Sequence, residues 1–295
     1  MVVRCVPSPV EAQAKRLPTL LDVGSMVGRT SPAAPDLLAR MASIKNSIGS
    51  CNAKPDADVG IFVSKMIPVK MNELSPRDAD MYRQRAVTKA QTGSSDGAST
   101  TEASNGSVLR EDDEVFLALG RVFSGQVTRD SNLFVLSNRH DPLVAASSSD
   151  VSTNGFDGDV PSLLSATATR LPPQTVGLYL CLGPSVTPVE SVSAGNIVAI
   201  AGLDQLILKT ATVSSSWACQ PLRAMTFQAR PMVRVAVEPK SHLDLGRLER
   251  GLASLYQYDP AVEVGTDEMG QHTVSCLGEL HLEQCLKSLT DRFAK

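Results

Sequence analysis

Apolar and polar residues alternate in short runs over the first two-thirds of the chain, as in a protein built from strands. The runs are bounded by Gly, Pro and Ser, and they lie at 58–70, 114–127, 132–137, 175–183, 196–203 and 206–213. Runs of this length and spacing are typical of short antiparallel strands. Because convincing helices are missing between the later runs, residues 51–221 are predicted to form a small β-barrel.

The pattern changes near residue 222, beyond which strand and helix periods alternate. Residues 231–239 have the period of a half-buried strand, and leucines recur at helical spacing over 242–258. Two strands follow at 261–268 and 272–278, and a second Leu-striped helix covers 279–293. This order is the split βαβ unit of a ferredoxin-like fold without its last strand. Residues 222–295 are therefore predicted to be a truncated α+β ferredoxin-like domain.

The remaining segments are less regular. Residues 1–50 contain Pro at five positions and are expected to be a linker with helical pieces at 10–17 and 34–48. A charged helix is predicted over 75–91, with Ser75 as its N-cap before Pro76. The stretches 92–107 and 145–160 are rich in Ser, Gly and Thr, and a segment of that composition is expected to be disordered.

Charge limits the ways in which the chain can bind nucleic acid. The net charge is −3 and the sequence pI about 5.8, so any such binding must use local basic patches. Arg230, Arg234 and Lys240 are candidates, because they alternate with the apolar residues of the 231–239 strand and can contact phosphate oxygens. A solvated sheet face is the alternative interpretation.

Residues 276–285 contain a group of residue types that often bind metals. At 100° per residue, Glu279 and Glu283 share one helix face, while His281 and Cys285 share the opposite face. Cys276 precedes Gly278, which permits a tight connection, and belongs to the preceding strand. These five side chains are not expected to converge, so no metal site is predicted. His281 is expected to be a core-edge residue, with a contact to RNA or a neighbouring domain as the alternative.

No other motif in the sequence indicates catalysis or cofactor binding. The chain has no G-x-x-x-x-G-K-[ST], no G-x-S-x-G and no H-E-x-x-H, so no catalytic or cofactor-binding residue is assigned. Its six cysteines include no C-x-x-C pair, and free thiols in a reducing cytoplasm are expected. The N-terminus has no signal-peptide pattern, and no apolar run is long enough for a membrane span.

Several segments resemble, in order, the elongation factor 2 superfamily of translational GTPases. The matching segments are VPSPVEAQAKR, IFVSKMIP, LGRVFSG, AGNIVAIAGLDQLILKTATV, ARPMVRVAVEPKSHLDLGRLERGLASLYQYDP and EMGQHTVSCLGELHLEQCL. The resemblance implies that residues 51–221 are the β-barrel domain II and 222–295 are domain III. Residues 1–50 are then the end of the junction that leaves the GTPase domain. Insertions at about 71–113 and 144–172 favour the elongation factor-like GTPases of ribosome biogenesis over elongation factor 2 itself.

This resemblance also implies a function and partners. The elongation factor-like GTPases of ribosome biogenesis act on the large ribosomal subunit in the cytoplasm, where they work with the Shwachman–Bodian–Diamond protein to release initiation factor 6. GTP and Mg²⁺ bind in a GTPase domain that this chain lacks, so the chain is expected to be a fragment that is inactive alone. A fragment of elongation factor 2 is the alternative, as is a stand-alone, non-catalytic ribosome-binding module. A sheet edge without its last strand is expected to make domain III marginally stable.

Overall fold

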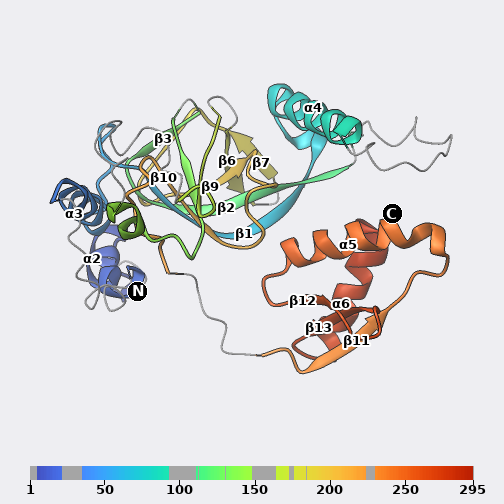
Figure 1. The fold of residues 1–295 in the computed structure, drawn as a ribbon. Helices are drawn as coiled ribbons and strands as arrows, with labels where there is room; N and C mark the ends of the chain where they lie inside the picture. The colour runs from blue at the N-terminus through green and yellow to red at the C-terminus, as the bar shows by residue number, and fades with distance from the viewer. Residues whose placement is uncertain are drawn as a thin grey trace. The chain divides into compact units, whose positions relative to one another are not determined.

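The computed structural model divides the chain into two compact units, Met1–Arg223 and Ala224–Lys295 (Figure 1). It describes residues 5–21, 35–92, 111, 113–129, 131–147, 164–172, 176–183, 185–223 and 230–294. The stretches predicted to be disordered, 92–107 and 145–160, lie almost wholly outside these residues. None of the described helices is long and apolar enough to cross a membrane.

The first unit is built around antiparallel strands. Eight described strands form one sheet in the order β5-β4-β10-β1-β2-β9-β6-β7, and β3 pairs with β8 separately. The bounds are β1 Gly60–Lys70, β2 Glu114–Ser124, β3 Gln126–Thr128, β4 Phe134–Leu136, β5 Ala168–Arg170, β6 Gly177–Leu182, β7 Ser185–Pro188, β8 Ser191–Ser193, β9 Ile197–Ala201 and β10 Ala211–Ser214. The longest pairing joins β1 to β2, with shifts of register at Gly60/Ile61 and Val63/Lys65. Such irregularities bend a sheet and increase its twist.

The closed barrel predicted for this segment is not confirmed. The described strands pair in an open order with β5 and β7 at its ends. The strand predicted at 206–213 is also shorter than expected, since it begins only at Ala211. Before it, the amide groups of Leu206 and Ile207 both bond to the Leu203 carbonyl, which makes a turn instead of a ladder. Ile207 is nevertheless buried, so its apolar character reflects packing and not strand pairing.

Helices α2 (Pro9–Leu20) and α3 (Pro35–Gly49) confirm the helices predicted near the N-terminus. They pack on the sheet around a cluster that includes Trp217, the only tryptophan of the chain. The buried Gln13 side chain fixes this contact, because its amide donates to the carbonyls of Ile48 at 2.6 Å and Phe123 at 2.8 Å. The two bonds tie α2 to α3 and to β2, while the Oε1 atom of Gln13 has no hydrogen-bond partner among the described residues.

Helix α4 (Pro76–Thr92) follows the short 3-10 turn η2 (Met71–Glu73) and is held to the sheet by polar side chains. Ser75 caps it as predicted, since its hydroxyl accepts from the Asp78 amide at 3.4 Å. The buried Asp78 carboxylate accepts from Ser75 Oγ at 2.8 Å and from the Tyr179 hydroxyl of β6. Burial and this carboxylate raise the pKa of Tyr179 to about 12, so it stays a donor.

Tyr82 provides a second anchor for α4. Its hydroxyl donates to the Phe116 carbonyl at 3.1 Å and accepts from the Gly202 amide at 3.0 Å. The pairing of β2 with β9 extends as far as Ala118↔Ile200, and in the same register Phe116 and Gly202 would be the second pair beyond it. The tyrosine oxygen therefore bridges two backbone groups that the ladder no longer joins directly.

The second unit has the predicted β-α-β-β-α order. Within residues 230–294, three strands form a sheet in the order β11-β13-β12, and both helices contribute to the core on one side of it (Figure 1). The elements are β11 Val233–Val237, the 3-10 turn η7 His242–Asp244, α5 Leu245–Tyr258, β12 Glu263–Thr266, β13 His272–Cys276, α6 Glu279–Ser288 and a π-helical turn η8 Leu289–Phe293. In a ferredoxin-like fold the last strand pairs with the first, which here is β11.

Candidate functional site

Of the three predicted basic residues of the second unit, Arg234 lies on strand β11 and the other two flank it. Arg234 is exposed on β11, between the half-buried Val233 and Val235. Its cross-strand partner is Ser275, whereas Val235 faces Val274 in the core. Arg234 therefore projects from the sheet face opposite the helices. Its guanidinium donates to Thr273 Oγ1 at 3.1 Å, which holds it across the sheet.

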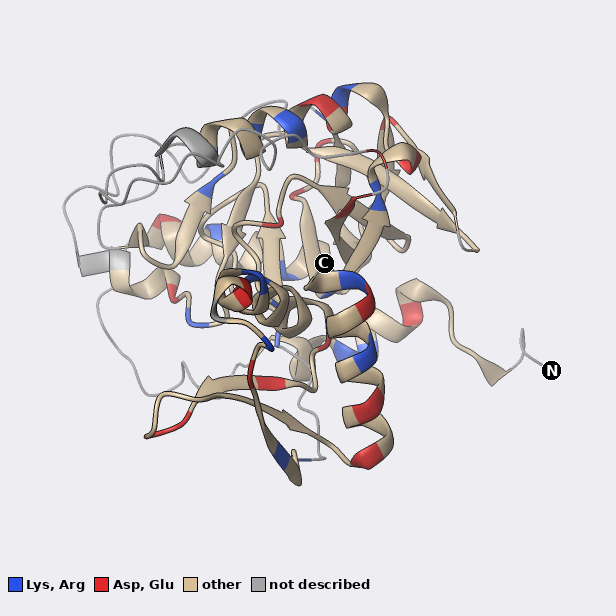
Figure 2. Cartoon of the chain, turned by 90° about the vertical axis from the view of Figure 1, so that its right-hand side faces the viewer, with Lys and Arg blue, Asp and Glu red and all other residues tan. Residues whose placement is uncertain are grey.

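The basic residues do not converge on one anion. Arg230 precedes β11 and Lys240 follows it, and both are exposed. At about 3.3 Å per residue, an extended segment separates them by up to roughly 33 Å. Figure 2 shows acidic and basic residues side by side on the same helices and strands. The arrangement suits separate contacts to successive phosphates of a polymer, and it does not suit one small anion.

His281 lies on the other side of the sheet and is not part of this row. Its Nδ1 accepts from the Leu277 amide at 3.1 Å, and its Nε2 lies 2.9 Å from Asp259 Oδ2. Because an amide can only donate, Nδ1 carries no proton, and the Nε2 proton points to the carboxylate. His281 thus sits at the edge of the core, joined to the residue that ends α5. No sequence signal connects Asp259 to a residue 22 positions away.

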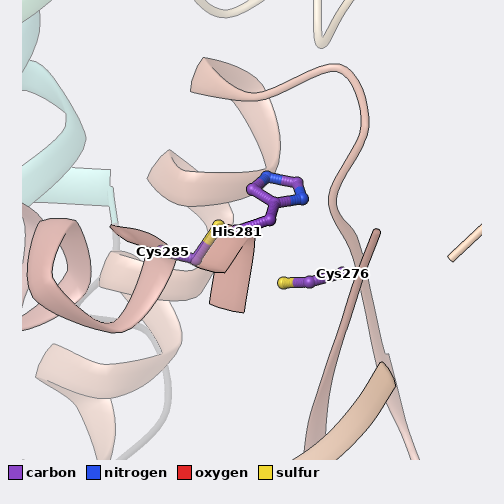
Figure 3. A group of neighbouring side chains, drawn as sticks. All are labelled: Cys276, His281 and Cys285. Atoms are coloured by element: carbon purple, nitrogen blue, oxygen red, sulfur yellow. The ribbon is translucent and has the colours of Figure 1, made fainter. Parts of the chain in front are cut away.

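The expectation that the metal-binding residue types stay apart was wrong for three of them. Cys276, His281 and Cys285 offer ligand atoms that all lie within 4.8 Å of one another (Figure 3). His281 and Cys285 share a face of α6, as the helical spacing predicts. Cys276 joins them because β13 ends beside α6, with the Cys276 side chain on the inner face of the sheet. Glu279 and Glu283 remain exposed on the opposite helix face.

The two thiols in this cluster are neutral in the protein as it stands. Cys276 and Cys285 are 0% and 3% exposed, and the Cys285 thiol donates a hydrogen bond to the sulfur of Cys276. Burial raises the pKa of both, that of Cys285 to about 12. A buried thiol of this kind does not act as a nucleophile near neutral pH.

The connection between β13 and α6 does not depend on glycine, contrary to the sequence-based interpretation. Gly278 has φ −178° and ψ −177°, which is extended backbone. A Cβ added there would meet no atom within 4 Å. The turn is made instead by the Leu282 amide, which bonds to the Gly278 carbonyl and starts the helix.

Two cavities share Glu249 and His272 in their linings: one lies between α5 and the β12–β13 hairpin, and the other lies among α5, the end of β11 and the turn of that hairpin. One has a volume of about 350 Å³ and reaches Tyr256, and the other has about 490 Å³ and reaches Met269. Neither is lined by Lys or Arg. A nucleoside triphosphate needs cationic groups around its phosphates, so neither cavity suits one.

The sequence of this chain is similar to those of known translation and ribosome-assembly factors. Residues 229–294 match the family described as elongation factor G, domain III. Over its whole length the chain is 32% identical to elongation factor-like GTPase 1 of Homo sapiens, of which it covers 29%. It is 30% identical to ribosome assembly protein 1 of Schizosaccharomyces pombe over 99% of its length, covering 28% of that protein. Elongation factor 2 of Encephalitozoon cuniculi is 29% identical over 98% of the chain, which covers 25% of it.

Proposed function

Because the chain belongs to the elongation factor 2 superfamily of translational GTPases, we propose that it forms domains II and III of a GTPase that matures large ribosomal subunits. The observation that carries this proposal is the extent of the similarity to a ribosome assembly protein, which runs across both compact units. The chain spans less than a third of the relatives it matches, so the activity of the whole protein is inferred from them.

In this proposal the chain binds the ribosome and relays the nucleotide state to it, and GTP hydrolysis occurs in the GTPase domain of the family. The 295 residues contain no phosphate-binding loop for GTP and Mg²⁺. Residues 51–221 would act as the domain II barrel and 222–295 as domain III, and rigid-body movement of these domains would transmit the nucleotide state to the ribosome. The proposed compartment is the cytoplasm. There the GTPase would work with the Shwachman–Bodian–Diamond protein to release initiation factor 6 from the large subunit.

The open sheet face of the second unit is the proposed contact with ribosomal RNA. Arg234 projects from that face, and Arg230 and Lys240 lie exposed at the two ends of β11. Contacts to phosphates position a protein on RNA without reading sequence, and they weaken as salt concentration rises. The three side chains are spaced for different phosphates, so their contributions should add.

Co-sedimentation of the purified chain with large ribosomal subunits tests this proposal. A variant with Arg230→Ala, Arg234→Ala and Lys240→Ala should bind more weakly, with a salt dependence whose slope is smaller by about 2–3. The matched control carries Arg247→Ala, Arg250→Ala and Lys287→Ala, which remove the same charge from α5 and α6. Equal binding by both variants would refute the proposed contact, and lack of binding by the unaltered chain would refute the proposed function.

Ribosomal translocation is the second candidate function, because elongation factor 2 of Encephalitozoon cuniculi matches nearly the whole chain. A translocase works on assembled ribosomes, whereas a maturation factor works on free large subunits. Sedimentation with each kind of particle separates the two. Preference for free large subunits supports maturation, and preference for assembled ribosomes supports translocation.

A further inference from the structure

We propose that Cys276, His281 and Cys285 form a binding site for a thiophilic d¹⁰ metal ion, with Zn²⁺ as the first choice. Among the described residues, these three side chains lie close enough together to hold one metal ion, because their ligand atoms are within 4.8 Å of one another. Two thiolates and an imidazole are a common donor set for Zn²⁺. The proposal does not depend on the function proposed above.

The geometry requires only a small adjustment. Zn–S bonds of about 2.3 Å and Zn–N bonds of about 2.0–2.1 Å put ligand atoms roughly 3.5–3.8 Å apart in a tetrahedral site. The present separations are at most 4.8 Å, so the atoms must approach by about 1 Å. Figure 3 shows Cys276 coming from the strand while His281 and Cys285 come from adjacent turns of one helix. Side-chain rotation can bring such residues together without moving the backbone.

Asp259 supplies the support that a histidine ligand usually has. Its carboxylate accepts the Nε2 proton of His281 at 2.9 Å, which leaves Nδ1 as the ligand atom. Carboxylates in this position fix the tautomer and orientation of the ring and raise its basicity. A metal would replace the Leu277 amide, which now donates to Nδ1. The partial exposure of His281 gives water access as a fourth ligand, whereas both thiols are buried.

The site would join by metal coordination three elements that now meet through packing and single hydrogen bonds. Asp259 ends α5, Cys276 ends β13, and the other two ligands belong to α6. The ion would therefore stabilise residues 224–295 against unfolding, in proportion to its concentration and affinity. Without metal, the same side chains are an ordinary hydrogen-bonded part of the core, and this is the interpretation that a negative result would establish.

The test uses the full chain, reduced and stripped of metal, and titrated with Zn²⁺ and with Co²⁺. One equivalent should bind, and Co²⁺ should give thiolate charge-transfer absorption with visible bands of tetrahedral type. Cys276→Ser and Cys285→Ser should each weaken binding at least about tenfold and reduce the charge-transfer band. Cys181→Ser, which changes an exposed cysteine of β6, is the matched control and should change neither.

Asp259→Asn keeps every proposed ligand and separates a metal site from a merely structural cluster. It should weaken Zn²⁺ binding by about 10–100-fold while the charge-transfer band remains at saturation. Circular dichroism shows whether each variant is folded, and Asp259→Asn decides the matter if the cysteine variants are not. The proposal is overturned if the reduced, unaltered chain gives no thiolate–cobalt absorption. It is also overturned if both cysteine variants bind like Cys181→Ser.

Discussion

Replacing Gly177 with Ala should destabilise the first unit, because the new methyl group would enter the space that Asp78 occupies. An added Cβ would lie 2.7 Å from Asp78 Cγ, which is 0.7 Å closer than the 3.4 Å at which ordinary contact begins. Asp78 has little freedom to withdraw, since Ser75 and Tyr179 both donate to its carboxylate. Gly177 has no positive φ, so the effect would come from crowding and not from backbone strain.

The expected loss follows from these contacts. Overpacking costs about 1–3 kcal/mol, and a weakened hydrogen bond to a charged group costs about 1.5–3 kcal/mol. The lower entropy of unfolded Ala offsets about 0.4–1 kcal/mol. A net destabilisation of about 1.5–5.5 kcal/mol should lower the unfolding midpoint of a unit of this size by roughly 3–22 °C.

The assay is thermal unfolding followed by tryptophan fluorescence. Trp217 is the only tryptophan and is buried in the first unit, so its emission reports on that unit alone. In an Asp78→Ala background the same Gly177→Ala change should cost almost nothing, because the crowded carboxyl group is gone. An unchanged midpoint for Gly177→Ala would refute the reasoning. So would an equal loss in both backgrounds.

Three further outcomes are expected. Gly278→Ala should change the free energy of unfolding of the second unit by less than about 0.5 kcal/mol in circular dichroism melts, because its φ is extended and the space is open; a loss above about 2 kcal/mol would contradict this. The first unit should lose stability as the pH falls below about 6.5, because burial holds the pKa of His140 below its ordinary 6.5 and the unfolded chain then binds more protons. Trp217 fluorescence measures this loss, which His140→Gln should abolish. With a thiol reagent, the reduced, metal-free chain should label quickly at Cys5 and Cys181 only, and a third fast cysteine would show that burial does not protect the others.

Local patterns predicted the second unit well because its periods are long enough to be distinctive. The alternation over 231–239 became β11, and the leucine spacing over 242–258 became α5. Ser75 before Pro76 marked the start of α4, since a cap signal depends on adjacent residues alone. In the first unit, strands β5, β7 and β8 have three or four residues each and show too little periodicity to predict.

The cluster around His281 escaped prediction for a different reason. Helical geometry relates His281 to Cys285, but it says nothing about a residue in the preceding strand. The position of Cys276 depends on where β13 ends relative to α6, and that is fixed by packing around Val274 and Leu289. Asp259 is still harder to predict, because it reaches the cluster from the end of another helix. Tertiary contacts of this kind produce no regular residue spacing in the sequence from which they could be predicted.

The hydrogen bonds of the Tyr82 hydroxyl limit how far the first unit can be shortened without losing stability. The hydroxyl oxygen of Tyr82 links the Phe116 carbonyl to the Gly202 amide by two hydrogen bonds, beyond the point where β2 and β9 stop pairing. Deleting α4 would take the tyrosine oxygen away from the buried Gly202 amide, and a buried unsatisfied group costs about 1–3 kcal/mol. A minimal version of the first unit should therefore keep residues 75–92, since α4, which lies between β1 and β2 in the sequence, holds the end of β2 to the end of β9.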